Sequence, residues 1–431
     1  MNRNQQVFSI ASLVNGISFS MILPLLAPLI REFKLSELQG GAMVSAGALF
    51  MAIAAIYISK NQTKYSIYQL LVIGFIGMSV TWTLFSGLLM YGMTASISLM
   101  SLFVLLVLAR ASTGVFMAMP QIALQTYVMN HFHDEQSRSQ TMSKFGALNS
   151  FGIIVGPFLT TIFLVGGLLT PLWIAVVLLA LVSVFIFFRF DQKTSLTPKK
   201  NHSIEDKHAL VREEHDSDAS IQSTKLSQPT SFSIRDILFW LSLGFYLYLA
   251  IVTLNLTAGF YIQDHFQMSI QESAVYFSQC SLIVGISLVI MQMIIAKLLK
   301  WSVYQLLAVG IVIMALGLGL SIWTEQIRVF QAAYVLYGIA VACFIPAFTT
   351  GAAQKAPQPL QGKVAGWCTA TQALSFVIGP LISTGLYQFE QALPYYFLIL
   401  ALIILAIYAV MTKLKDQRLD QEKVNQPYMQ N

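Results

Sequence analysis

Charged side chains are scarce in this sequence. Only 10% of its 431 residues are Asp, Glu, Lys or Arg, whereas 56% are hydrophobic. Because a soluble domain usually carries about 25% charged residues, the composition excludes an ordinary soluble protein. The net charge of +6 is spread between apolar runs and forms no basic patch, so we expect no nucleic-acid partner.

Sequence motifs for enzymatic chemistry are also lacking. The chain contains no His-Glu-x-x-His, no Gly-x-Ser-x-Gly, no phosphate-binding loop and no paired metal-ligand motif. Its three cysteines, Cys280, Cys343 and Cys368, lie in apolar stretches without Cys-x-x-Cys spacing, and we expect them to be packing residues. We therefore expect no metal, no cofactor and no catalytic residue, and a polytopic membrane enzyme is only a distant alternative.

Long apolar stretches dominate what is present. Twelve of them reach about the 20 residues that a helix needs to cross the hydrocarbon core of a bilayer. The expected spans are 7–30, 39–59, 68–90, 97–122, 145–167, 171–190, 237–262, 273–296, 303–323, 330–352, 364–386 and 393–412. The first is too long for a signal-peptide core and no clear small-residue cleavage site ends it, so we expect it to be retained.

One long polar segment, residues 191–236, divides these spans into six and six. It is rich in Ser, Lys, Asp, Glu, Gln and His, which predicts a flexible linker and excludes the folded soluble domain that a sensor or assembly protein would carry. The sequence thus predicts an all-α polytopic membrane protein with two six-helix halves. The expected halves are residues 1–190 and 237–412, followed by a tail at 413–431.

Basic residues are distributed unevenly between the two sides of these spans. If both termini are cytoplasmic, 21 of the 25 Lys and Arg residues are cytoplasmic, whereas Arg31, Lys34 and Arg328 are outside and Arg110 lies within a span. Short loops rich in Lys and Arg face the cytoplasm. We therefore expect a multi-pass protein of the cell inner membrane with both termini in the cytoplasm, and a monomer.

The two halves show an internal repeat. YSIYQLLVIG at 65–74 matches WSVYQLLAVG at 301–310, and GIIVGP at 152–157 matches SFVIGP at 375–380. Both matches fall at equivalent places in the two halves, which indicates a duplicated six-helix unit. Parallel repeats of this kind are typical of the major facilitator class of transporters.

Two motifs add to this resemblance. Gly152, Gly156 and Pro157 in span 5 resemble the Gly-x-x-x-Gly-Pro motif of drug:proton antiporters within the major facilitator superfamily, although Thr160 and Thr161 replace a glycine pair. Gly379 and Pro380 are their counterparts in span 11. Gly permits close helix packing and Pro removes a backbone hydrogen bond, so a packing kink is the alternative to a functional role. By resemblance, the motif favours export.

Arg110 is the one formally charged residue well inside a predicted span, and with Gly114 it resembles the Arg-x-x-x-Gly motif of span 4 in the same family. A buried cation is costly unless it faces a cavity or a polar partner. The resemblance implies a role in proton coupling or gating, and a structural anchor is the alternative. The loop between spans 2 and 3 departs from the family signature, because it keeps basic residues at Lys60 and Lys64 and lacks the Asp.

Acidic residues are absent from the span interiors, because all 19 fall in loops or at span ends. This disfavours a pump for organic cations, which needs a buried negative charge. The carboxylates nearest the membrane are Glu32, Glu37, Asp264 and Glu272, and we expect Glu32, Asp264 and Glu272 to line the outer mouth. For each of them, a solvated loop charge is the alternative.

Uncharged polar residues inside the spans are candidates for a solute cavity, because polar groups in lipid turn inward. They are Asn15, Ser18, Gln121, Gln125, Asn149, Asn255, Thr257, Gln279 and Gln372. Each could instead join neighbouring helices. The resemblance implies a secondary transporter that works by alternating access and exports a small amphipathic or anionic molecule with protons as the coupling ion. An importer or facilitator of an organic acid, a sugar or a siderophore-like compound is the alternative.

Overall fold

The computed structural model describes residues 2–61, 64–94, 98–131, 135–191, 234–299, 301–357 and 360–425. Within these ranges the chain forms α-helices and short 3-10 helices, and no strand. Twelve of the helical segments are long and apolar enough to cross a membrane. The predicted all-α class and the number of spans are confirmed. Most of the predicted linker, residues 192–233, lies outside the described residues.

Among the described residues before that linker, the chain forms seven α-helices and two 3-10 helices for which bounds can be given. They are α1 (Arg3–Met21), η1 (Leu23–Leu25), α2 (Leu26–Glu32), α3 (Glu37–Lys60), α4 (Ile67–Thr94), α5 (Leu99–His131), α6 (Glu135–Phe163), η3 (Leu164–Gly166) and α7 (Thr170–Arg189). The part after it consists of η6 (Ile234–Ile237), α8 (Leu238–His265), α9 (Ile270–Lys297), α10 (Val303–Trp323), α11 (Ile327–Gln354), α12 (Gln361–Phe389) and α13 (Leu393–Asn425).

The first span is broken, which the sequence analysis did not predict. α1 ends at Met21, η1 follows with Pro24 near its start, and α2 continues the same span to Glu32. Proline lacks the N–H that would continue the α-helical ladder, so the helix changes to a tighter 3-10 turn there. This break sets the position of α2 and of Arg31 at its end.

Several helices extend beyond their predicted bounds. α5 continues to His131 where the prediction ended at 122, α6 begins at Glu135 where the prediction began at 145, and α13 runs to Asn425 where the prediction ended at 412. The prediction followed apolar residues, since these mark the lipid-embedded part of a helix. Helices that leave the hydrocarbon core continue into polar residues without an apolar signal.

Helix caps explain part of the internal repeat. α3 and α9 begin with Ser36 and Ser269 as N-caps, each in a capping box with the Gln or Glu three residues later. In the matching segments of the repeat, Ser66 and Ser302 exchange the same pair of hydrogen bonds with Gln69 and Gln305. Reciprocal bonds of this kind satisfy N–H groups that a helix start leaves free, so the conserved spacing fixes where equivalent spans begin.

Glycines allow the closest helix contacts in the first half. α6 packs along α1, and a Cβ atom at Gly152 would overlap the backbone carbonyl oxygen of Leu13. Gly156 lies equally close to Ser20 on α1. The Gly-x-x-x-Gly spacing in α6 therefore acts as a packing surface, as such motifs do in membranes.

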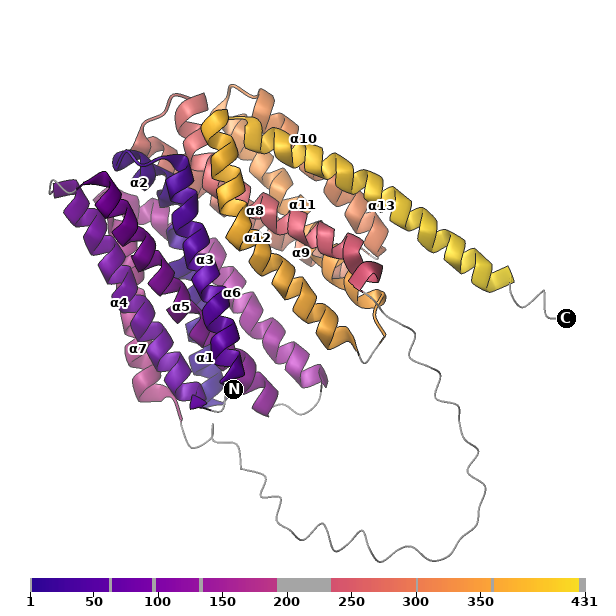
Figure 1. The fold of residues 1–431 in the computed structure, drawn as a ribbon, viewed down its shortest axis with the longest axis horizontal. Helices are drawn as coiled ribbons and strands as arrows, with labels where there is room; N and C mark the ends of the chain where they lie inside the picture. Colours follow the sequence, from indigo (N-terminus) through magenta and orange to yellow (C-terminus); the bar gives the residue numbers. More distant parts are fainter. Residues whose placement is uncertain are drawn as a thin grey trace, which may run out of the picture.

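The two groups of helices lie side by side and are inclined to each other (Figure 1). Across the boundary, α3 packs on α12, α6 packs on α9, and α2 contacts α8 and α9. We call the end of the bundle with the α2–α3 and α8–α9 connections the Arg31 end. The opposite end, where α7 finishes at Arg189 and η6 begins at Ile234, is the linker end.

Gly152→Ala is expected to destabilise the protein by about 1–3 kcal/mol, because the added methyl group forces α6 away from α1. Gly146→Ala on the same helix is the matched control, since a Cβ there meets no atom within 4 Å. Thermal unfolding in detergent measures both variants. Equal melting temperatures for the two variants would contradict the close α1–α6 contact.

Candidate functional site

A hollow of about 200 Å³ opens among the helices of the first half and is rich in amide side chains. Four of the nine cavity residues predicted from the sequence line it, namely Asn15 on α1, Gln121 and Gln125 on α5, and Asn149 on α6. The rest of the lining includes Ser12 and the aromatic rings of Phe8, Phe75 and Phe145. No charged side chain is among the lining residues.

Asn15 and Asn149 are joined by a hydrogen bond in the lining of this hollow. The Nδ2 of Asn15 donates a hydrogen bond to Oδ1 of Asn149 over 3.3 Å. The helices approach closely here because Gly16, next to Asn15, lies against the backbone of Asn149. Each amide keeps further donor and acceptor capacity, so this pair can hydrogen-bond a solute that enters the hollow.

The hollow lies in the linker-end half of the bundle, because its lining includes Phe8 near the start of α1 and Met142 in the first part of α6. Gln121 and Gln125 are exposed. Gly146 on α6 and Gly366 on α12 both face open space, with nothing within 4 Å of an added Cβ. A solute can therefore reach the amides from the linker end.

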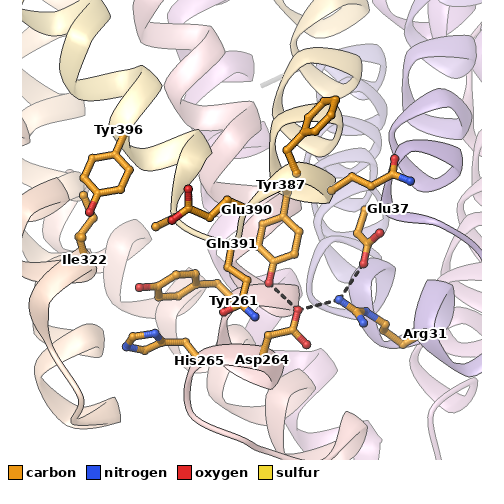
Figure 2. A pocket seen from close by; sticks show the side chains of 13 residues that line it. Arg31, Glu37, Tyr261, Asp264, His265, Ile322, Tyr387, Glu390, Gln391 and Tyr396 are labelled. Atoms are coloured by element: carbon orange, nitrogen blue, oxygen red, sulfur yellow. Dashed lines mark hydrogen bonds and ion pairs between the residues drawn. The ribbon is translucent and has the colours of Figure 1, made fainter.

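The Arg31 end is closed by an ionic cluster that joins the two groups of helices (Figure 2). The Nη2 of Arg31 on α2 donates to Oδ2 of Asp264 on α8 over 2.7 Å, and lies 2.7 Å from Oε1 of Glu37 on α3. Tyr387 on α12 donates its hydroxyl to the same Asp264 oxygen over 2.7 Å. The guanidinium of Arg31 also lies 5.3 Å from the ring centroid of Phe260, a distance at which cation and ring attract.

Small residues and hydroxyl groups close the boundary below this cluster. Gly41 on α3 lies against Pro380 and Thr384 of α12. Between α6 and α9, the hydroxyls of Thr161 and Ser278 share a hydrogen bond across the boundary. Within the first half, Thr160 on α6 donates to the carbonyl of Met21 on α1 over 2.9 Å. The two threonines that replace the glycine pair of the family motif therefore tie α6 to α1 and to α9.

A second hollow, of about 580 Å³, lies at the Arg31 end beside the cluster. Its lining includes Arg31, Glu37, Asp264 and Tyr387, together with Glu390 and Gln391 from the α12–α13 connection. The cluster residues thus line this hollow, and none of them lines the amide-rich hollow.

The remaining polar candidates of the sequence analysis lie away from the amide-lined hollow. Ser18 is buried and its hydroxyl has no hydrogen-bond partner among the described residues. Asn255 and Thr257 donate to carbonyls of their own helix, at Ile251 and Thr253. The side-chain oxygen of Gln279 accepts a 2.7 Å bond from Gln331, which joins α9 to α11. Gln372 on α12 is half-buried.

The three residues predicted for the outer mouth have different surroundings. Asp264 belongs to the ionic cluster, whereas Glu272 accepts bonds from the N–H and hydroxyl of Ser269 in the cap of α9. Glu32 is exposed at the end of α2. Arg31 and Tyr387 were not among the predicted site residues. Arg31 could have been noticed in the sequence. The predicted topology places only three basic residues outside the cytoplasm, where Lys and Arg are disfavoured in short loops, and Arg31 is one of them.

Arg110 is buried on α5, with 9% of its surface exposed. Its guanidinium lies over the rings of Trp82 and Phe85 on α4, at 5.5 and 5.7 Å from their centroids. The arginine is not part of the lining of either hollow. Its role in coupling or gating therefore stays a prediction.

Within the described ranges, no group of three or more His, Cys, Asp or Glu side chains could hold a metal ion. Gly152 and Gly156 serve the α1–α6 contact, and Pro157 lies inside α6. Gly379 lies against Val252 and Leu249 of α8. Chemically, the arrangement offers a neutral hydrogen-bonding hollow open at one end and an ionic closure at the other.

Comparison with known proteins gives a clear family match. The family model described as Major Facilitator Superfamily matches residues 8–380 and, in a second match, 285–427. No curated protein matches the sequence.

Solved structures share the fold at low sequence identity. The nucleoside transporter NupG, as a point mutant, has a TM-score of 0.68 at 14% identity, with 95% of this chain and 100% of that chain covered. A D-xylose–proton symporter has a TM-score of 0.69 at 14% identity, covering 94% and 96%. The human organic anion transporter MFSD10 has a TM-score of 0.61 at 17% identity, covering 94% and 99%.

Proposed function

The chain belongs to the major facilitator superfamily, and on this premise we propose that it exports a small amphipathic or anionic solute in exchange for protons. The observation that carries the proposal is the pairing of an amide-lined hollow, open at the linker end, with an ionic closure at the Arg31 end. A carrier that works by alternating access needs a site open to one side and a barrier that closes the other. We take the linker end as cytoplasmic, on the distribution of Lys and Arg.

The chemistry of the hollow supports an uncharged or weakly anionic solute. Asn15, Asn149, Gln121 and Gln125 offer N–H donors and carbonyl acceptors, and the neighbouring Phe rings offer apolar faces. Ligand sites usually have volumes of about 300–1,000 Å³, so a hollow of 200 Å³ holds one part of the solute. We propose that the rest contacts the second half, where Asn255 and Gln372 are half-buried.

The direction and the coupling ion rest on different features. Export is supported by the Gly-x-x-x-Gly-Pro segment of α6, which resembles the motif of drug:proton antiporters. Proton coupling accords with a fold that a D-xylose–proton symporter shares, and anionic solutes accord with a fold that an organic anion transporter shares.

An importer or facilitator of a metabolite is the second candidate. It is favoured by the lining of the amide-rich hollow, which includes no carboxylate that could carry a proton. The direction of flux decides between the two. A thermal-shift screen in detergent, followed by counterflow of the hits in proteoliposomes, identifies the solute. A pH gradient of either sign then shows whether protons drive export or import.

Asn149→Ala is expected to weaken binding of the solute found in this screen by about three- to tenfold, because a neutral hydrogen bond contributes about 0.5–1.5 kcal/mol. Asn61→Ala is the matched control, since that amide is exposed at the end of α3 and donates to the carbonyl of Tyr57. Binding is measured by the shift in melting temperature with solute concentration. Equal affinities in both variants would place the solute elsewhere.

Arg110→Ala is expected to abolish the pH dependence of transport in everted vesicles while the protein stays folded, if Arg110 takes part in proton coupling or gating as proposed. Arg110 has aromatic neighbours on α4, and a buried cation that only anchors helices would instead affect stability. Melting temperature is therefore measured alongside transport. Full pH-coupled transport in this variant would remove Arg110 from the mechanism.

A further inference from the structure

The ionic cluster at the Arg31 end joins charges that belong to different halves. A single guanidinium nitrogen of Arg31 is 2.7 Å from the carboxylate of Glu37 and 2.7 Å from that of Asp264. Arg31 and Glu37 stand on α2 and α3 of the first half, and Asp264 and Tyr387 on α8 and α12 of the second (Figure 2). Within this cluster, the ion pair of Arg31 with Asp264 crosses the boundary, as does the approach of the same guanidinium to the ring of Phe260 on α8.

Opening of the Arg31 end separates these residues in a defined way. When the halves part, Arg31 leaves Asp264 and keeps Glu37, which follows it in the chain after a four-residue connection. Asp264 leaves Arg31 and keeps the hydroxyl of Tyr387. Each charge therefore retains a partner within its own half, and no charge is left unpaired when the boundary opens.

We propose that Glu37 is a positioning residue for the transport cycle. It is the counter-ion that remains paired with Arg31 each time the Arg31 end opens and Asp264 moves away. This inference rests on the proposed alternating access. Tyr387 has the corresponding role for Asp264, as the donor that remains after Arg31 withdraws.

Glu37 affects the open and closed states in opposite ways. In the closed state its carboxylate converges with that of Asp264 on one nitrogen, and two like charges so close repel each other. In the open state it is the charge that stabilises Arg31. The side chains of Arg31, Glu37 and Asp264 are 32%, 16% and 23% exposed, so water screens these interactions only in part. Both effects of Glu37 favour opening.

The two carboxylates thus provide a matched pair of variants. Glu37→Gln and Asp264→Asn each remove one negative charge and keep the shape of the side chain. Glu37→Gln removes the repulsion in the closed state and the partner of Arg31 in the open state, so the Arg31 end is expected to stay closed more of the time. Asp264→Asn removes the attraction across the boundary, so the same end is expected to open more often.

The test is the distance between spin labels at positions 165 and 389, one in each half at the Arg31 end, measured by pulsed electron paramagnetic resonance in lipid nanodiscs. Val165 and Phe389 are 94% and 86% exposed, so labels there do not disturb packing. The ratio of long to short distances is expected to fall roughly two- to fivefold in Glu37→Gln and to rise by a similar factor in Asp264→Asn. Tyr387→Phe is expected to shift the ratio in the same direction as Glu37→Gln, because Asp264 then has no donor in the open state.

Two results would overturn the proposal. If both carboxylate variants open the Arg31 end, Glu37 stabilises the closed state and is not the residue that pairs with Arg31 in the open state. If Glu37→Gln leaves the ratio unchanged while Asp264→Asn raises it, Glu37 is a bystander. Neither result bears on the proposed export, which fails separately if the wild-type protein shows no counterflow with any solute of the screen.

Discussion

The hydrocarbon core of a bilayer offers no hydrogen-bond partner, and the structure of this protein depends on that constraint. Every N–H and C=O in the core must be satisfied within the chain, which leaves helices as the spanning element for this sequence. Lipid also removes the hydrophobic driving force between helices, so packing and hydrogen bonds have to hold them together. Two contacts of this protein meet that requirement. α1 and α6 pack closely at Gly152 and Gly156, and Thr160 donates a hydrogen bond to the carbonyl of Met21.

The same constraint explains how the boundary between the halves can be reversible. A hydrogen bond between helices in lipid contributes on average about 0.6 kcal/mol, and a partly exposed ion pair about 0.2–1 kcal/mol. The Thr161–Ser278 bond and the Arg31–Asp264 pair are contacts of these kinds. They can close one end of the bundle without making its opening prohibitive.

The sequence predicted those features that depend on local composition. Asn15, Gln121, Gln125 and Asn149 could be found because amides are conspicuous in apolar helices, and three helices, α1, α5 and α6, bring them together. The Arg31–Asp264 pair could not, because its partners are 233 positions apart and each looks like an ordinary loop charge. For Gln279, polarity suggested a cavity, and the structure shows that its side chain accepts a hydrogen bond from Gln331 on the neighbouring helix. Knowing which face of a helix meets which neighbour requires the packed structure.

Alternating access requires that the Arg31 end open in every cycle, and a covalent bond across the boundary tests this most directly. Thr161 and Ser278 share a hydrogen bond between α6 and α9, so cysteines at both positions lie within reach of a disulfide. In a background with Cys280, Cys343 and Cys368 replaced by alanine, oxidation of Thr161→Cys/Ser278→Cys should stop transport of the solute and reduction should restore it, while the single variants stay active. Undiminished transport by the fully cross-linked protein would contradict the account.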